Sequence, residues 1–469
     1  MKIVGESGAG WFAGTLAVLV ALASAGMNTT AHAQVAENRV NAPLSLAQAM
    51  QRARESAYSV RIARAQADEA GARARQAVAA LFPRIDGDAQ RIWWDSAVNK
   101  ASGQSWAPQF PARVTTAAVQ VSQPLIGLFP LTLAARAGYM LADVASISAD
   151  QAKRDGALLG AQSFLNAVRA VQFFKIAETS FALVEKQKND ADAMYRAGKL
   201  SQADVMRFEL SVADGRAQLT QANVAKELSL LALSETLLET YSEKDIEAPA
   251  VSLFETKNLT PPPLGEVLKS AFERRPELKA AQSQLSIANL TTWAARLDYS
   301  PSLNAFARYE RDFEIGDIVT RPTDTPANFV LAKRDDVRNK FSFGLQLKWN
   351  LWDWGSRWNK ISETVAQRSK AELAEQQAAS MLKTEVIKSY LDLKSAADAL
   401  QTSLSSVKLA EEVYRLTQAR FSNGQASPTD LITAERDQAR ARGGLVSARS
   451  DVDLAWFRLQ RNMGLEPTL

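Results

Sequence analysis

The sequence repeats itself once over most of its length. Residues 46–90 align without a gap on residues 264–308 at an offset of 218, and the offset then becomes 226 for more than a hundred residues. Identical residues recur in both copies, among them Leu46/Leu264, Ala77/Ala295, Pro83/Pro301, Gln120/Gln346, Gly198/Gly424, Ser201/Ser427, Asp204/Asp430 and Glu209/Glu435. A unit of about two hundred residues is too long for a solenoid repeat. We therefore expect one module at 34–262 and its copy at 263–469, in a pseudosymmetric arrangement.

The first 33 residues have the pattern of a secretory signal peptide. Lys2 precedes an apolar stretch at residues 11–25, and residues 31–33 match the small-x-small pattern of a signal-peptidase site. A membrane anchor is the alternative, but a helical span needs about 18 apolar residues, so the pattern favours export and cleavage. No later segment is apolar enough for a membrane helix. An exported chain of this kind is expected to enter a membrane only as strands of a closed barrel.

Composition argues against an enzyme. The chain has no Cys, and its one His is His32, within the predicted signal peptide. The mature chain would therefore lack the commonest general base, a thiolate nucleophile and most transition-metal ligands. We predict no catalytic residue, no cofactor and no metal site. The net charge of +4 comes from basic residues interleaved with Asp and Glu, which indicates solvated helix faces rather than a nucleic-acid partner.

Two segments in each copy have strand character, at about 84–94 and 113–124 and at about 302–311 and 340–351. In residues 341–351, six apolar residues alternate strictly with polar or small ones, as in a half-buried strand. This length approaches the roughly 9–11 residues of a tilted transmembrane strand. An ordinary two-layer core is the equally weighted alternative. Loops are predicted at 95–112 and 311–340. Tryptophans near the strand ends suggest an interfacial girdle: Trp93, Trp94, Trp106, Trp349, Trp352, Trp354 and Trp358.

Long helices follow the strands in each copy. One apolar seam with 4-3 spacing consists of Val386, Tyr390, Leu393, Ala397, Leu400, Leu404 and Val407, and a second runs through residues 431–459. Such spacing, sustained over several turns, is typical of coiled coils. A helix over about 131–195 would be roughly 95 Å long, which no globular domain needs. Residues 44–81 predict one more helix without a break, and residues 264–297 predict its counterpart, interrupted at Pro276.

Each pair of long helices reverses at a similar turn, at 195–201 and at 421–427. Gly198 and Gly424 suit the left-handed conformation that closes a helix, and the serine three residues later suits an N-cap. Asp204 and Asp430 follow at the position that completes a capping box. A polar, Pro-containing linker at 242–263 joins the two modules.

This order of elements resembles the TolC family of outer-membrane efflux proteins. The resemblance is carried by the G-x-x-S-x-x-D pattern in both turns and by the strand-to-helix junctions at 120–127 and 346–355, and it covers essentially all of the chain after residue 33. It implies a mainly α fold with membrane β structure. Long α-helical coiled-coil hairpins would lie in the periplasm, and four β-strands per protomer would contribute to a trimeric 12-stranded outer-membrane β-barrel.

The resemblance implies an outer-membrane channel. Such a channel is the exit duct of a tripartite efflux pump or type I secretion system, and it passively conducts substrates from an inner-membrane transporter. The implied partners are two further copies in a homotrimer, a periplasmic adaptor (membrane fusion) protein, an inner-membrane pump or ABC exporter, and outer-membrane lipid. The adaptor would dock at the hairpin tips, which comprise Gly198, Lys199, Leu200, Ser201, Gly424, Gln425, Ala426 and Ser427.

The resemblance also makes Asp204, Asp430 and Arg207 candidates for a pore gate. Two Asp from each of three copies would form an acidic ring that favours cations. As helix caps alone they would contribute about 1 kcal/mol each, and one Asp can do both. Some relatives carry a basic residue before the second-turn Ser, where this chain has Ala426. Arg207 either supplies the missing ionic tie or pairs with a solvent-exposed carboxylate.

Two other classes of protein fit part of the pattern. A periplasmic coiled-coil adaptor would have one central hairpin flanked by β domains, whereas strands precede the hairpin here and the whole unit is doubled. An envelope scaffold without channel activity explains the heptads but gives the alternation at 341–351 no role.

Overall fold

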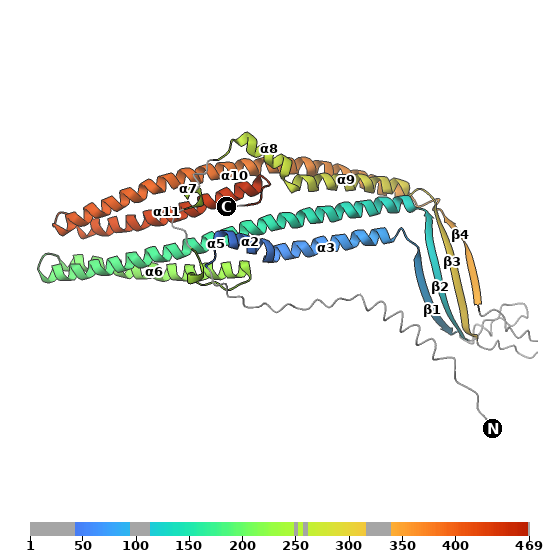
Figure 1. Ribbon diagram of the computed structural model, residues 1–469, viewed down its shortest axis with the longest axis horizontal. Coiled ribbons are helices and arrows are strands. Elements are labelled where there is room, and N and C mark those ends of the chain that lie inside the picture. Colours follow the sequence, from blue (N-terminus) through green and yellow to red (C-terminus); the bar gives the residue numbers. More distant parts are fainter. Residues whose placement is uncertain (1–42, 94–112, 248–251, 257–260, 316–338, 468–469) are drawn as a thin grey trace, which may run out of the picture. The chain divides into compact units, whose positions relative to one another are not determined.

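The computed structural model describes residues 43–93, 113–247, 252–256, 261–315 and 339–467 (Figure 1). In this part of the chain the two copies of the repeat form the same series of elements. The first copy contains α2 (Leu46–Ser56), α3 (Tyr58–Ala79), β1 (Arg84–Trp93), β2 (Arg113–Ile126), α5 (Leu128–Arg196) and α6 (Gln202–Leu237). The second contains α8 (Leu264–Arg274), α9 (Pro276–Leu297), β3 (Ser302–Ile315), β4 (Asn339–Lys348), α10 (Ser356–Ser422) and α11 (Pro428–Asn462). Between the copies lie η1 (Glu243–Asp245) and α7 (Leu253–Thr256).

The element boundaries follow the two sequence offsets. Helices α2 and α3 start and end 218 residues before α8 and α9. Strand β2 and helix α6 start 226 residues before β4 and α11. The duplication therefore extends to the local structure of both modules, and any difference between counterpart residues can be interpreted residue by residue.

The helix predicted without a break at 44–81 is wrong, because the structure has two helices there. Ala57 lies between α2 and α3 with φ −53° and ψ 139°, which ends the first helix. Its counterpart Arg275 is also extended, with φ −68° and ψ 123°. In the second copy Pro276 disfavours a helical conformation for the residue before it. The first copy breaks at the same place without a proline.

The four strands form one antiparallel sheet in the order β1-β2-β3-β4 (Figure 1). Strand β4 ends at Lys348, three residues before the predicted end at 351, and β3 extends to Ile315 rather than 311. The predicted loop from 311 therefore starts inside a strand. Trp94 and Trp106 lie outside the described residues. Trp93 ends β1 at one end of the sheet, whereas Trp349 follows β4 at the other end.

The two faces of the sheet differ in chemistry. Phe341, Phe343, Leu345 and Leu347 share one face of β4 and are 62–79% exposed, so no second layer of described residues covers them. The register places Tyr309 beside Phe341 on this face. The other face carries a charged network. In it, Arg308 contacts Asp88 (3.3 Å) and Glu310 (3.2 Å), and Lys340 contacts Glu310 (3.3 Å) and Asp312 (3.0 Å).

The long helices form two antiparallel hairpins, α5 with α6 and α10 with α11 (Figure 1). In the first copy, helices α2 and α3 pack on α5. In the second copy, α8 and α9 pack on α10. Helix α11 also packs on α5 and so joins the two copies. Among the described helices, none combines the length and the apolar character that a bilayer span requires.

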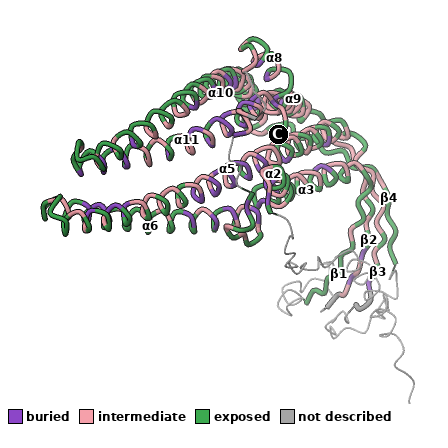
Figure 2. The backbone as a smooth tube through the Cα atoms, turned by 60° about the vertical axis from the view of Figure 1, so that its left-hand side comes forward, coloured by how far each residue is buried: buried purple, intermediate pink, exposed green. Residues whose placement is uncertain are grey.

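The predicted heptad seams form the core of the hairpins. Val386, Leu393 and Leu400 of α10 are buried in one cluster with Val452 and Leu459 of α11. The first hairpin is held by a matching cluster of Leu44, Ala49, Ala53, Phe164, Ala167, Val168, Leu230, Leu233, Leu237 and Ile246. Figure 2 shows buried residues as stripes along the helices, alternating with exposed turns. This distribution is expected where amphipathic helices pack side by side.

Small residues bring α2 close to α5. A Cβ atom at Gly160 would lie 2.6 Å from both the carbonyl oxygen of Ala49 and the Cβ of Ala53. The second copy has Val386 at the position of Gly160 and Val267 at the position of Ala49, and both valines are fully buried. The two copies therefore fill the same interface with different volumes, and only the first requires glycine.

Candidate functional site

Two tight turns connect the long helices, and both have the local structure that the sequence predicts. Gly198 has φ +69° and Gly424 has φ +71°, in the left-handed region that glycine adopts without a Cβ clash. In the first turn the amide of Lys199 donates to the carbonyl of Met194 at 2.9 Å. In the second turn the amide of Gln425 makes the equivalent hydrogen bond at 2.8 Å. Each turn therefore reverses the chain within a few residues.

A Ser and an Asp form a capping box at the N-terminus of the helix that follows each turn. The amide of Asp204 donates to Oγ of Ser201 at 3.2 Å, and the amide of Ser201 donates to Oδ2 of Asp204 at 3.3 Å. Ser427 and Asp430 make the same two hydrogen bonds at 3.2 and 2.9 Å. The predicted capping boxes are confirmed. Each Asp therefore has a structural role as the third helical residue of a capping box, which is compatible with a further role in a pore.

Both carboxylates are held in the ionised form. The Ser201 hydroxyl, which donates to the carboxylate at 2.7 Å, is the main cause that lowers the pKa of Asp204, and Arg207 lowers it further. The backbone amide of Ser427 is the main cause that lowers the pKa of Asp430, with a smaller contribution from Arg420. Each turn thus presents a negative charge with a guanidinium near it. Arg420 is a site residue that the sequence analysis missed.

Arg207 connects the two turns of the chain. Its Nη1 donates to Oγ1 of Thr429, in the first turn of α11, at 2.7 Å. The sequence predicts an ionic tie or a pairing with a carboxylate for Arg207, whereas its hydrogen-bond partner in the structure is a hydroxyl. The sequence does not indicate that Thr429 is a partner of Arg207. Its counterpart in the repeat is Ala203, whose side chain cannot form a hydrogen bond, so the residue is not shared by the two copies.

A small apolar cluster lies directly behind the turns. It joins residues of all four long helices, which include Ala191, Phe208, Tyr414, Leu431, Ile432 and Ala434. The rings of Phe208 and Phe421 lie edge to face with centroids 6.1 Å apart. Because the cluster takes side chains from both hairpins, it holds the two tips side by side.

One buried acid lies beside this cluster. Glu435 is 4% exposed and accepts a hydrogen bond from the hydroxyl of Ser180 on α5. Burial raises the pKa of Glu435, and the hydrogen bond from Ser180 opposes that effect. Its counterpart Glu209 is exposed on α6. The sequence shows the Glu209/Glu435 identity but does not reveal that the two residues have different surroundings.

The predicted docking residues are mostly accessible. Leu200 and Ala426 are half-buried, and Leu200 packs against the cluster behind the turns. The others are exposed: Gly198, Lys199, Ser201, Gly424, Gln425 and Ser427. Among the described residues, no group of three or more His, Asp and Glu is placed to hold a metal ion.

Part of the chain matches a known protein family and a curated relative. Residues 267–465 match the family model described as outer membrane efflux protein. Protein CyaE of Bordetella pertussis is 23% identical over 280 residues, which cover 60% of this chain and 56% of CyaE. The chain thus spans little more than half the length of this curated relative.

Solved structures share the fold over nearly the whole chain. The CmeC outer membrane channel of Campylobacter jejuni superimposes with a TM-score of 0.73 at 14% identity, covering 93% of this chain and 92% of CmeC. The outer membrane protein VceC of Vibrio cholerae gives a TM-score of 0.69 at 16% identity, covering 90% of this chain and 97% of VceC. At these identities the likeness establishes the fold.

The resemblance predicted from the sequence is confirmed. The matched domain and the fold are those of outer-membrane channels and not of enzymes. The chain therefore carries an outer membrane efflux protein domain at residues 267–465 and has the fold of the TolC-like outer-membrane channels.

Proposed function

We propose that this chain is the exit duct of a tripartite efflux pump or type I secretion system. It would passively conduct substrates that an inner-membrane transporter delivers, through a homotrimer whose strands lie in the outer membrane and whose helices lie in the periplasm. The observation that carries the proposal is a sheet with one exposed apolar face, joined directly to two long helical hairpins.

The sheet supports the trimer. Strands β1 and β4 each pair on one side only among the described residues, so each presents an unpaired edge. Such edges invite pairing with another chain, and four strands are too few to close a barrel. Three copies would supply twelve strands. The exposed face of Phe341 and Phe343 would then contact lipid, and the charged network around Arg308 would line the interior.

The hairpins support a role in spanning the periplasm. Helix α5 has 69 residues and α10 has 67, so each is about 100 Å long at 1.5 Å per residue. The strand end and the turn end of each hairpin are thus separated by most of that length. The exposed residues of the turns, from Gly198 to Ser201 and from Gly424 to Ser427, are available for a periplasmic adaptor protein.

The turns also support a gate. We infer that Asp204 and Asp430 of three copies form an acidic constriction, and that Arg207 and Thr429 hold neighbouring hairpins together there. Export by the predicted signal peptide is part of the proposal, and residues 1–33 lie outside the described part of the chain.

The test is the state of the protein in unheated detergent extracts of membranes. The expected result is a species of about three times the chain mass of 51.1 kDa, which converts to the monomer on heating. A second expected result is cross-linking of Lys199→Cys or Gln425→Cys to a periplasmic protein, whereas Gly87→Cys in the sheet gives no such product. A soluble monomer recovered from the periplasm would contradict the proposal and favour a scaffold protein instead.

A further inference from the structure

A cluster of polar side chains lies between the two hairpins, about two helical turns behind their tips. It contains Ser180 and Gln187 of α5, Tyr414 of α10 and Glu435 of α11, of which the last three are 4–9% exposed. The hydroxyl of Ser180 donates to the carboxylate of Glu435, and Nε2 of Gln187 donates to the hydroxyl of Tyr414 at 3.3 Å. Both hydrogen bonds therefore join α5 of the first hairpin to a helix of the second.

This polar cluster is incompletely hydrogen-bonded. Oε1 of Gln187 is buried and has no hydrogen-bond partner among the described residues. Buried polar atoms are normally paired, and an unpaired one is unfavourable in a low-dielectric interior. The hairpins thus meet here at a contact that is less stable than an apolar seam, so the charge of a single buried group can decide its strength.

The basic residues near Glu435 on its own helix have other partners. Arg436 pairs with Asp214 of α6 at 2.8 Å. Arg442 pairs with Glu411 of α10 at 2.9 Å. Among the described residues, no Lys or Arg forms an ion pair with the carboxylate of Glu435.

The groups that face Glu435 from α5 and α10 are neutral. A cavity of about 40 Å³ adjoins Glu435, and its α5 side is lined by Ile176, Thr179, Ser180 and Leu183. The titratable group on α10 is Tyr414, whose pKa is raised by burial, so its hydroxyl remains neutral. An ionised Glu435 would therefore be buried without a paired cation, which is costly, whereas the neutral acid is not.

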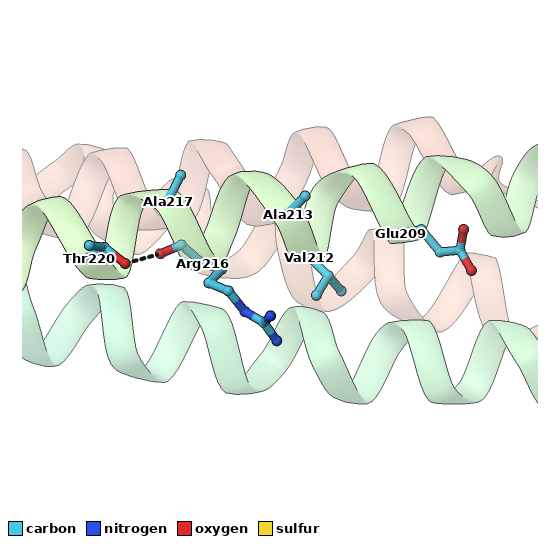
Figure 3. Close-up of a pocket in the computed structure, with 6 residues that line it drawn as sticks. All are labelled: Glu209, Val212, Ala213, Arg216, Ala217 and Thr220. Carbon is cyan, nitrogen blue, oxygen red and sulfur yellow. Dashed lines mark hydrogen bonds between the residues drawn. The ribbon is translucent and has the colours of Figure 1, made fainter.

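The aligned residue of the first copy has different surroundings. Glu209 lies at one end of a groove on the outer side of α6 (Figure 3) and is exposed. The other residues that line this groove belong to the same helix: Val212, Ala213, Arg216, Ala217 and Thr220. The helix thus accommodates a solvated carboxylate at this position of the repeat. The burial of Glu435 results from the contact of α11 with α5, so it reports whether that contact is intact.

Few groups of this chain can respond to pH near neutrality. Histidine is the usual side chain that titrates between pH 5 and 8, and the one His is His32 in the predicted signal peptide. Burial raises the pKa of two described carboxyl groups, Glu435 and Asp453. Asp453 contacts the linker about 27 Å further along α11. Glu435 is the one that lies between the two hairpins near the tips.

We propose that Glu435 is a proton-dependent latch between the two hairpins of one chain. The neutral acid holds α11 against α5 behind the tips. Loss of its proton favours separation of the hairpins, which brings the carboxylate into contact with water. This inference rests on the proposed channel, because separation of the tips would open the proposed gate, and it adds control of that gate by pH.

The direction of the effect follows from linkage between proton binding and the contact. Burial raises the pKa of Glu435, and Ser180 and Arg436 oppose that effect only in part. In separated hairpins the residue would return to the ordinary glutamate pKa of about 4.3. The proton therefore stabilises the closed contact fully below that pH, and the contribution is lost as pH rises through the raised pKa. Acid closes the latch, and a rise in pH releases it.

The cysteine-free sequence allows a direct test with spin labels. Lys199→Cys/Gln425→Cys places one label on each exposed turn, and double electron–electron resonance measures the distance between them in the detergent-solubilised protein. The distance distribution is expected to shift to longer values between pH 5 and pH 7.5. Added Glu435→Gln is expected to abolish the shift, because the amide is neutral at every pH and still accepts the hydrogen bond from Ser180. Ser180→Ala is expected to move the transition to higher pH, since the carboxylate loses a donor.

The matched control is Asp453→Asn in the same labelled protein. It removes the other carboxyl group with a raised pKa, which lies at the linker, and the shift is expected to persist. Distances that do not change with pH, or a shift that persists in Glu435→Gln, would overturn the latch. A shift that is lost in Asp453→Asn and kept in Glu435→Gln would overturn it as well.

The distance measurement and the channel function can fail separately. A cation-conducting trimer whose tip distances are independent of pH overturns the latch and leaves the channel standing. A pH-dependent distance that requires Glu435, in a protein that leaves a lipid bilayer insulating, supports the latch and overturns the channel.

Discussion

The guanidinium of Arg207 and the hydroxyl of Thr429 form a 2.7 Å hydrogen bond between the two hairpin tips of one chain. The counterparts of these residues are Thr433 and Ala203, which cannot form an equivalent bond between copies. A trimer would therefore contain three such ties rather than six. In such a trimer the tips would alternate between tied and untied neighbours, so opening of the proposed gate is expected to begin between copies.

The first prediction concerns this tie. Arg207→Ala is expected to raise the channel open probability at least about five-fold, because each hydrogen bond to a charged group contributes roughly 1 kcal/mol or more and a trimer loses three of them. Thr429→Val is expected to have the same effect, and the double variant no more than either single one. Single-channel recording measures this. The control is Thr433→Val, at the exposed counterpart of Arg207, with no change expected. Additive effects of the two single variants would show that the residues act independently.

The second prediction separates the cap from the acidic ring. Asn keeps an oxygen that accepts the N-cap hydrogen bonds, so Asp204→Asn/Asp430→Asn is expected to lose cation preference with little loss of thermal stability. Ser201→Ala/Ser427→Ala is expected to lose about 1 kcal/mol per cap and to keep the preference. Because the pKa values of both Asp are lowered, the unmodified channel is expected to remain cation-selective down to about pH 4. Unchanged selectivity in the Asn variant would leave only the capping role.

The third prediction concerns Asp453 on α11. This residue is 5% exposed and accepts hydrogen bonds from the amides of Leu253 and Phe254, both at 3.0 Å, which anchors α7 of the linker. Burial raises the pKa of Asp453 to about 6, against about 3.9 in an unfolded chain. The folded protein thus binds this proton more tightly, so its contribution to stability falls as pH rises from about 4 to 6.

The expected amount is about 3 kcal/mol at neutral pH, from roughly 1.4 kcal/mol per pKa unit. Asp453→Asn removes this pH dependence but weakens one of the two backbone hydrogen bonds at every pH. The difference in melting temperature between the variant and the unmodified protein is therefore expected to be more favourable to the variant at pH 7.5 than at pH 4. A difference that is the same at both pH values would show that Asp453 does not titrate in this window.

The sequence predicts much of this fold because the duplication shows each element twice. The turns at Gly198 and Gly424, with their capping boxes, were predictable from local chemistry alone. The break at Ala57 was not predicted, because only the aligned Pro276 reveals it. The sequence of the first copy alone has a helical pattern that continues through Ala57. The end of β4 at Lys348 was misplaced, because apolar alternation continues past the last sheet hydrogen bond.

The candidate site was predictable only in part. Asp204 and Asp430 follow from sequence spacing, whereas the contact of Arg207 with Thr429 joins residues 222 positions apart and depends on how the hairpins pack. The burial of Glu435 likewise depends on α5 covering α11. Its exposed counterpart Glu209 is the same residue type at the aligned position of the repeat. Differences between counterparts thus report tertiary contacts that neither copy reveals alone.

The fourth prediction tests the close approach of α2 to α5. Gly160→Ala places a Cβ against the backbone of Ala49, where neither side can move easily. Overpacking of this kind costs typically 1–3 kcal/mol, so a lower melting temperature is expected by circular dichroism. The matched control is Gly444→Ala, also within a long helix, where a Cβ meets no atom within 4 Å. That variant is expected to gain up to about 1 kcal/mol from helix propensity. Equal effects of the two substitutions would contradict the packing described here.

If three copies of this chain form one conducting channel, electrical conductance across a lipid bilayer detects it directly. The purified trimer-sized fraction is added to a planar lipid bilayer, and the current is recorded at fixed voltage. We expect discrete, uniform conductance steps from a cation-selective channel that opens more often in Arg207→Ala. A verified trimeric fraction that leaves the bilayer insulating, in both the unmodified protein and Arg207→Ala, would contradict it.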